Sequence, residues 1–293
     1  MDRVLGAVRC PVCAQSLTRV SAATLGCGRG HRFDIARQGY VSLLTGRSTG
    51  LSSDTAEMIA ARRAALAGLP YRALREAVAG SVAAALTDTA EDTHERPRKS
   101  PLIVDAGCGT GQYLASCLDA HPDALGLGLD LSKYAARATA KAHDRAAAAV
   151  ADLWQPWPLA DGCASVVVSV FAPRGLAQAR RVLVSGGTLV VATPRVDHLA
   201  ELIEPMGMLD VAPDKVERLG ESLAAAGFGP VSTTAISRRD AWTADAVVDA
   251  VAMGPSAFHT SPEQLRARAR QLCGSDNTVE VTTSVDVTVA RSG

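Results

Sequence analysis

Three cysteines and one histidine near the N-terminus have the spacing of a metal site. The first pair is Cys10 and Cys13, and after 13 residues the second pair follows, Cys27 and His31. Two short loops that each provide two ligands close a tetrahedral site without straining the backbone, and thiolates prefer zinc to hard cations. Because side chains fill all four positions, we predict a structural zinc site. The alternative is two unrelated pairs of reduced cysteines.

A glycine-rich segment with the sequence VDAGCGTG runs from Val104 to Gly111, between an apolar run and a helical pattern. Its glycines let the backbone approach a ligand, and the start of the following helix offers free N–H groups. The spacing differs from the GxGxxG of dinucleotide sites. An acid directly before the glycines would repel a pyrophosphate but suits the sulfonium and ammonium of S-adenosylmethionine. The residues predicted at this cofactor are Asp105, Gly107, Gly109, Thr110 and Gly111.

Two further acids stand where predicted strands end. Asp130 closes the run LGLGLD, and Asp152 follows the run ending in Val150. An acid at roughly 20–25 residues after the glycines accepts hydrogen bonds from ribose hydroxyls. An acid after the third strand is placed to accept from the adenine amino group. Together with the acid before the glycines they would line one edge of a sheet, which makes S-adenosylmethionine the leading cofactor.

The elements that must position these residues follow from the alternation of β-branched runs with Ala-rich segments after residue 100, which predicts an α/β fold with a parallel sheet. Residues 1–35 are expected to form a zinc-binding domain and residues 101–293 the sheet domain. Between them, residues 36–100 would form a helical connector that ends in an exposed polar linker from Thr87 to Ser100. The predicted helices are 54–66 and 71–86; the predicted strands are 102–104, 125–129, 147–150, 166–170, 188–192 and a pair near the end that includes 279–289.

Net charge is zero, with 30 basic and 30 acidic residues, but the charges are unevenly distributed. Residues 1–75 carry 11 basic and 4 acidic side chains, a surplus of +7 that residues 76–293 balance with −7. A basic N-terminal part on an acidic body is typical of a domain that contacts phosphate, although chance variation is the alternative. Neither a signal peptide nor a membrane-length apolar run is recognisable, so we expect a cytoplasmic protein that does not contact membranes.

With these residues in hand, the chain resembles the large-subunit (23S) ribosomal RNA (guanine-N1)-methyltransferases of the RlmA type. The likeness includes the zinc set and the segments HRFDIARQGYVSLL, DTAEMIAARRAAL, VDAGCGTG, VFAPR, GGTLVVATP and VAMGPSAFH. VADLWQPWPLADG and VFAPR look closer to the tylosin-resistance branch. The resemblance implies a Rossmann-like class I methyltransferase domain with a small zinc-ribbon-like domain. It also implies a homodimer that methylates N1 of a guanine in a hairpin or loop of 23S rRNA, with Tyr71 and His198 at the cofactor.

The residues alone leave several functional roles open. The base that removes the guanine N1 proton is unknown, with Asp197 and Glu201 as hypotheses. The segment from Phe171 to Arg174 is expected either to face the substrate or to form a surface turn. For Trp154 and Trp157, which flank Pro156, we expect packing in the core more than stacking on a base. The arginines expected to grip RNA are Arg29, Arg32, Arg37, Arg62 and Arg63. Two alternatives are a small-molecule methyltransferase with a structural zinc knuckle and a non-catalytic zinc RNA-binding module.

Overall fold

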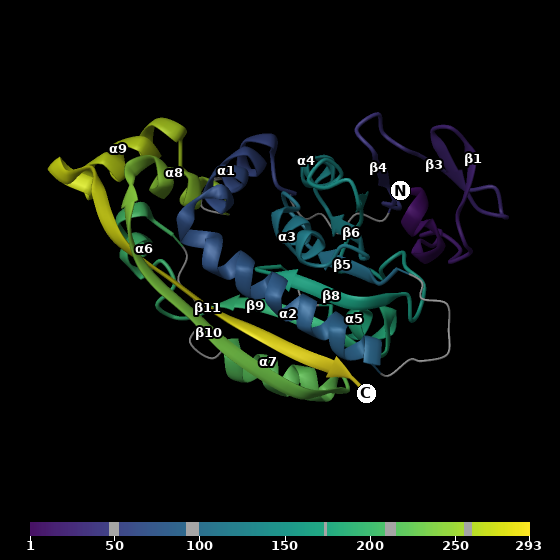
Figure 1. The fold of residues 1–293 in the computed structure, drawn as a ribbon. Helices are drawn as coiled ribbons and strands as arrows, with labels where there is room; N and C mark the ends of the chain where they lie inside the picture. The colour runs from purple at the N-terminus through teal and green to yellow at the C-terminus, as the bar shows by residue number, and fades with distance from the viewer. Residues whose placement is uncertain (47–52, 92–99, 173–174, 209–214, 255–259) are drawn as a thin grey trace.

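The computed structural model describes residues 1–46, 53–91, 100–172, 175–208, 215–254 and 260–293. Its backbone forms a three-stranded N-terminal sheet and one eight-stranded sheet flanked by helices (Figure 1). In this view the N-terminal sheet and helix α9 (Pro262–Cys273) lie at opposite ends of the molecule. Within the described ranges, no helix is long and apolar enough to cross a membrane.

The strands have the following bounds: β1 (Thr18–Ser21), β2 (Thr24–Gly26), β3 (Arg32–Asp34), β4 (Tyr40–Ser42), β5 (Leu102–Ala106), β6 (Leu125–Asp130), β7 (Ala146–Val150), β8 (Ala164–Val170), β9 (Leu183–Pro194), β10 (Phe228–Thr243) and β11 (Thr278–Ser292). The other α-helices are α1 (Ala56–Ala67), α2 (Arg72–Glu91), α3 (Gln112–Ala120), α4 (Lys133–Thr139), α5 (Leu176–Val182), α6 (Ala200–Met206), α7 (Lys215–Ala225) and α8 (Ala244–Ala252). Short 3-10 turns cover Asp2–Ala7, Leu69–Tyr71 and Gly274–Asp276.

The large sheet has the order β10-β11-β9-β8-β5-β6-β7-β4. Its strands from β9 to β4 pair in parallel, and β11 pairs antiparallel with both β9 and β10. The chain runs outward through β5, β6 and β7 and then returns to the other side of β5 with β8 and β9. The order therefore reverses between β5 and β8, and ligands bind at such a point outside the carboxyl ends of the strands.

Two apolar layers cover the sheet because neighbouring residues of each strand face opposite sides. Val166 and Val168 pack into one layer with α2 and α3, and Val167 packs into the other. The buried strands read as nearly continuous β-branched or Ala runs, as expected where both faces are covered. The predicted α/β fold with a parallel core is confirmed, and each predicted core strand lies within an observed strand.

Several element boundaries differ from prediction. Helix α1 begins at Ala56, two residues after the predicted start, because the Thr55 hydroxyl accepts a hydrogen bond from the Met58 N–H (3.3 Å) and caps the helix. The stretch predicted as a polar linker from Thr87 is helical as far as Glu91. Extending a helix that packing already holds costs little, so α2 continues without an apolar face. Residues 92–99 of that stretch lie outside the described residues.

The N-terminal segment is joined to the large sheet by its own hydrogen bonds and core. The Arg9 N–H donates to the Pro158 carbonyl (2.8 Å) and the Ala160 N–H to the Ala7 carbonyl (2.8 Å). Its buried side chains belong to the same apolar cluster as one face of the large sheet; they include Val4, Val8, Leu17 and Leu25. Strand β4 then adds to the sheet edge, where Tyr40 pairs with Ala148 of β7. The zinc segment is therefore held in a fixed place against the sheet.

The turn from β5 into α3 leaves no room for side chains at its last glycine. Gly107, Gly109 and Gly111 have φ of 87°, 51° and 76°, which favour glycine. A Cβ on Gly111 would lie 2.8 Å from the Cα of Thr139, closer than real Cβ contacts allow. Because the obstructing atom is backbone, α4 would have to move away from the turn.

We expect Gly111→Ala to destabilise the protein well beyond the strain of a left-handed alanine. The matched control is Gly162→Ala, where φ is 56° and no atom lies within 4 Å of the added Cβ. The control incurs only the left-handed strain, about 1–2 kcal/mol. Gly111→Ala adds the collision with Thr139, so we expect its free energy of unfolding, measured with denaturant, to fall by at least about 2 kcal/mol more than that of the control. Equal losses in both variants would contradict the close approach of the turn to α4.

Candidate active site and metal centre

A pocket of about 550 Å³ opens at the carboxyl ends of β5, β6 and β8, where the strand order reverses. Its volume is in the range of small-molecule and cofactor sites. The residues predicted at the cofactor that line it are Tyr71, Gly107, Gly109, Thr110, Asp130, Asp152 and His198. Asp105 and Gly111 are not among the lining residues. Asp105 lies buried at the end of β5, and Gly111 begins α3.

The carboxylate of Asp130 ties the glycine-rich turn to the neighbouring strand. One oxygen accepts from the Gly109 N–H (2.9 Å), and the other accepts from the Ser132 N–H (2.8 Å). Burial raises the pKa of Asp130 from its usual value, although these two hydrogen bonds oppose the rise. Since each carboxylate oxygen can accept more than one hydrogen bond, a ribose hydroxyl can still bind there.

Two other acids hold oxygens that receive no hydrogen bond from any residue that the structure describes. Asp105 is 2 % exposed with Oδ2 unpaired, and burial followed by the charge of Asp130 raises its pKa to about 7. Asp152 accepts the Trp154 N–H with Oδ1 (2.9 Å), whereas its buried Oδ2 is unpaired. Buried polar atoms nearly always have partners, so such oxygens indicate a ligand with donors or positive charge. This donor set fits S-adenosylmethionine, which has a sulfonium, an ammonium and an adenine amino group.

Tyr113 also lines the pocket, although its sequence context did not indicate a site residue. It stands in the first turn of α3, is 7 % exposed, and has a hydroxyl without a hydrogen-bond partner in the described structure. The Tyr71 hydroxyl is likewise buried and unpaired. A tyrosine in an amphipathic helix is normally a core residue. Only its position in the first turn of the helix, two residues after Gly111, could have indicated a role at the pocket.

Helix α1 closes one side of the pocket through Arg62, whose guanidinium is bound by neighbouring elements. Its guanidinium forms an ion pair with Asp54 and donates to the Met253 carbonyl (2.8 Å). The Ser132 hydroxyl donates to the backbone carbonyl of Asp54 (2.7 Å) and so joins the start of α1 to the end of β6. Arg62, one of the arginines expected to grip RNA, is half-buried and joins α1 to the end of α8.

The residues suggested as the catalytic base do not line the pocket. Both oxygens of Glu201 accept hydrogen bonds from Thr282, from the hydroxyl (2.7 Å) and from the N–H (3.0 Å). Asp197 is half exposed and lies 3.9 Å from Arg195. The structure therefore gives neither carboxylate direct access to the pocket, and no catalytic base is assigned.

Aromatic side chains surround the pocket mouth. Trp154 lines the pocket and is 65 % exposed, so the expectation that it packs in the core is wrong. Trp157 does pack in the core and donates through Nε1 to the Leu153 carbonyl (3.3 Å). Phe171, at the end of β8, lines the pocket with its ring exposed. The neighbouring residues 173 and 174, which include the arginine considered for substrate binding, lie outside the described residues.

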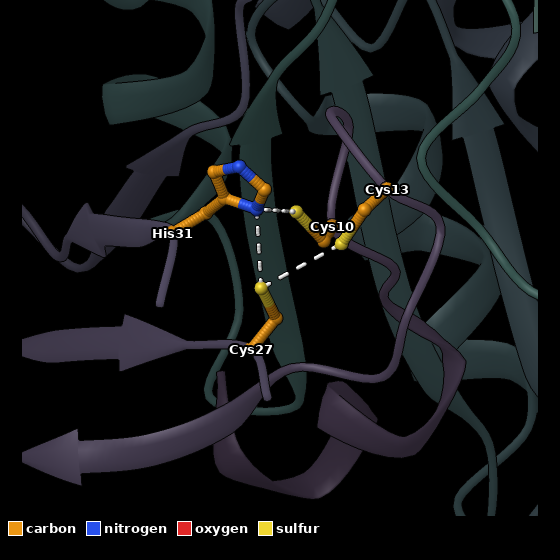
Figure 2. A group of neighbouring side chains, drawn as sticks. All are labelled: Cys10, Cys13, Cys27 and His31. Atoms are coloured by element: carbon orange, nitrogen blue, oxygen red, sulfur yellow. Dashed lines mark hydrogen bonds between the residues drawn. The ribbon is translucent and has the colours of Figure 1, made fainter. Parts of the chain in front are cut away.

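The four predicted zinc ligands converge in the N-terminal sheet (Figure 2). The Cys13 and Cys27 sulfurs lie 3.6 Å apart, and His31 Nδ1 lies 3.5 Å from the Cys10 sulfur and 3.3 Å from the Cys27 sulfur. A disulfide would need a distance near 2.05 Å. Around tetrahedral zinc, ligand atoms are separated by about 3.5–3.8 Å, as bond lengths of 2.0–2.3 Å require. The set therefore fits zinc.

Hydrogen bonding within the cluster already favours the thiolate form of one ligand. Burial would raise the pKa of the Cys27 thiol, but hydrogen bonds from the Arg29 and His31 backbones and from the His31 ring lower it to about 6. Thiolates are the form that binds metal.

Comparison with known proteins extends over almost the whole chain. Residues 8–47 match the family model "RlmA, N-terminal", and residues 103–187 match "Methyltransferase domain". A protein of Streptomyces fradiae named "23S rRNA (guanine(748)-N(1))-methyltransferase" is 46 % identical over 284 residues, which cover 97 % of this chain and 96 % of that protein. The chain belongs to the 23S rRNA (guanine-N1)-methyltransferase family.

Two further relatives in this family carry similar names. A protein of Micromonospora griseorubida named "Putative 23S rRNA (guanine-N(1)-)-methyltransferase" is 48 % identical over 90 % of this chain and 91 % of its own length. A Bacillus subtilis protein with a name of the same kind is 35 % identical over 66 % of both chains. The Rossmann-like methyltransferase fold with a zinc ribbon is thus confirmed, and its cofactors are S-adenosylmethionine and zinc.

Removal of zinc ligands should unfold the ribbon. We expect a Cys10→Ser/Cys27→Ser double variant to bind less than a tenth of the zinc of the unsubstituted protein. The variant should also melt at lower temperature, because metal binding supplies roughly 10–16 kcal/mol in small zinc modules. Metal analysis after gel filtration and circular dichroism measure both effects. Cys163→Ser is the control, since Cys163 lies outside the cluster; full zinc content in the double variant would contradict the assignment.

The raised pKa of Asp105 predicts that cofactor affinity increases with pH. Between the ordinary value of 3.8 and about 7, the folded protein holds a proton that the unfolded chain has released. Folding stability without cofactor therefore falls as pH rises through this window. A cationic cofactor favours the ionised carboxylate, so binding releases protons and strengthens as pH rises from about 6 to 8.

Titration calorimetry at several pH values measures this linkage. We expect Asp105→Asn to lose the part of the pH dependence that the carboxyl group contributes. Asp123→Asn is the matched control because Asp123 is exposed on the surface. Identical pH slopes in Asp105→Asn and the unsubstituted protein would show that Asp105 does not respond to the cofactor.

Proposed function

We propose that the protein transfers the methyl group of S-adenosylmethionine to N1 of a guanine in 23S rRNA. The observation that carries this proposal is the 46 % identity to the Streptomyces fradiae relative over 97 % of this chain. That span includes both the zinc ribbon and the pocket at the strand ends. A small-molecule methyltransferase would not need a ribbon whose core continues into the sheet.

Methyl transfer from a sulfonium needs alignment of donor, carbon and acceptor more than activation of the methyl group. Guanine N1 carries a proton at neutral pH and must lose it before or during transfer. It also lies on the Watson–Crick edge, so the target base must be in a hairpin or loop or must leave its pair. The pocket therefore has to admit an extruded base beside the cofactor.

In this proposal the cofactor is held by the residues that gather at the pocket. The glycine-rich turn, including Thr110, supports its methionine part, and Asp105 offsets its positive charge. Asp130 accepts from the ribose, and Asp152 accepts from the adenine amino group. Tyr71 and His198 complete the walls, as the family resemblance implies. The unpaired buried oxygens of Asp105 and Asp152 support these roles.

RNA recognition is assigned to residues 1–35, and methyl transfer to residues 101–293. Arg29, Arg32 and Arg37 are exposed on and next to the ribbon and are available to phosphates. Because the ribbon is anchored to the sheet, these cations hold a fixed position relative to the pocket. We further infer a homodimer and a cytoplasmic location, both from the family resemblance and the ribosomal substrate. Resemblance to the tylosin-resistance branch supports a contribution to macrolide resistance.

The proposal is tested with labelled S-adenosylmethionine and unmodified 23S rRNA, free and in assembled large subunits. We expect nucleoside mass spectrometry to detect 1-methylguanosine. Reverse transcription should stop at the modified base, because a methyl group on N1 blocks Watson–Crick pairing. S-adenosylhomocysteine in excess is the inhibition control. Label in another nucleoside would refute the acceptor atom, and absence of label from both substrates would refute the RNA assignment.

A further inference from the structure

We propose that Phe171 and His198 form the subsite for the acceptor base. In this subsite the Phe171 ring stacks on the target guanine, and the Nε2–H of His198 donates a hydrogen bond to the guanine O6. The inference rests on the proposed function and names the residues that recognise the base and assist its reaction.

Phe171 has a strained backbone conformation and an exposed ring. Its φ of 51° lies in the left-handed region, where a bulky residue is strained. The ring is 42 % exposed and lines the pocket instead of packing in the core. Its N–H donates to the Ala192 carbonyl (3.1 Å), which fixes the backbone at the end of β8. Strain of this kind persists where the surrounding structure holds a side chain for a task.

His198 lies against the same ring and also lines the pocket. The two ring centroids are 5.6 Å apart, with the planes inclined by 30°. The His198 Nδ1 accepts a hydrogen bond from the Ser284 N–H of β11 (3.1 Å). A backbone N–H can only donate, so Nδ1 is unprotonated and the proton of the neutral ring is on Nε2. The structure thus fixes the tautomer that presents an N–H donor.

The imidazole stays neutral at physiological pH. Burial lowers the pKa of His198 to about 4, although the charge of the adjacent Asp197 opposes the decrease. An imidazolium would repel the sulfonium that shares the pocket. A neutral N–H donor stabilises negative charge on the base without adding a second cation.

The chemistry of guanine explains why a donor is needed at this place. As the N1 proton leaves for solvent water, negative charge spreads from N1 to O6. The N1–CH3 bond then forms while the S–CH3 bond breaks, and the sulfonium becomes a neutral thioether. A donor at O6 is strongest when that charge is largest, so it lowers the barrier more than it strengthens binding. Adenine carries an amino group in place of O6, and its N–H would face the N–H of His198.

Substitutions at both positions test the subsite with separate measurements of kcat, KM for RNA, and Kd for S-adenosylmethionine. We expect His198→Leu to lower kcat about 100-fold, the typical loss for one donor to a developing oxyanion. His198→Gln, which keeps an N–H donor, should recover most of this activity. The kcat–pH profile of His198→Leu should move to higher pH, because without the donor N1–H is harder to deprotonate. The loss of kcat should exceed any rise in cofactor Kd, since His198 also lines the cofactor pocket, and the melting temperature should stay close to that of the unsubstituted protein.

Phe171→Ala should lower kcat/KM for RNA about 5- to 150-fold, the range that one base–aromatic stack of 1–3 kcal/mol spans. Phe171→Gly should lose as much activity as Phe171→Ala. It should melt at a higher temperature than Phe171→Ala, since glycine adopts this φ without strain. Val196→Ala is the matched control, because Val196 is 54 % exposed near His198 and is not among the pocket-lining residues. An RNA with inosine at the target position should remain a substrate, since inosine keeps O6 and N1–H.

The outcomes separate this inference from the proposed function. If the unsubstituted protein makes no 1-methylguanosine on rRNA or large subunits, both fail. If it does, and His198→Leu keeps its kcat and pH profile, the donor role is wrong. A rise in cofactor Kd that matches the whole loss of kcat/KM would overturn the role toward the base and leave His198 as a cofactor residue alone. Unchanged kcat/KM for RNA in Phe171→Ala would overturn the stacking role.

Discussion

The close approach of the glycine-rich turn after β5 to α4 and to the end of β6 is the constraint on which the site depends. The turn after β5 must pass within van der Waals distance of α4, so Gly111 cannot carry a side chain. The Asp130 carboxylate then fastens this turn to β6 by accepting the Gly109 N–H. Without both features the start of α3 would move outward, and the part of the pocket lining that the glycine-rich turn provides would move with it.

The pocket gathers polar groups that the protein itself does not satisfy. Oxygens of Asp105 and Asp152 and the hydroxyls of Tyr71 and Tyr113 are buried without partners in the described structure. In a core such groups would cost free energy with no return. At the pocket they are available to a ligand that brings its own charge and hydrogen bonds. The pocket is also lined by the aromatic rings of Phe171 and Trp154 and by His198, which suit the planar base that we propose there.

The ribbon shows how a small element gains a fixed position from two different sources. Zinc supplies the free energy that a segment with so few apolar side chains lacks. Its remaining apolar residues, such as Leu17 and Leu25, enter the cluster below the large sheet. Hydrogen bonds at Arg9 and Ala160 complete the junction. The metal holds the ribbon folded, and the shared core determines where its cations stand.

The sequence by itself determined the chemistry that depends on residue type and short spacing. Two pairs of ligands predict the zinc set, and alternating apolar runs predict the core strands, because these features are local along the chain. The glycine spacing and the acids at strand ends indicate the cofactor for the same reason. Longer-range features needed the fold, because contacts between residues far apart in the chain have no local signature.

Only the tertiary structure showed that β4 joins the sheet edge and that Arg62 binds Asp54 at the pocket. It also placed Trp154 at the surface and Tyr113 in the wall, where an isolated sequence pattern suggests core packing. The tautomer of His198 is decided by a backbone N–H that follows it by 86 residues in the chain. Side-chain roles of this kind depend on which strands become neighbours, and that is settled by packing of the whole sheet.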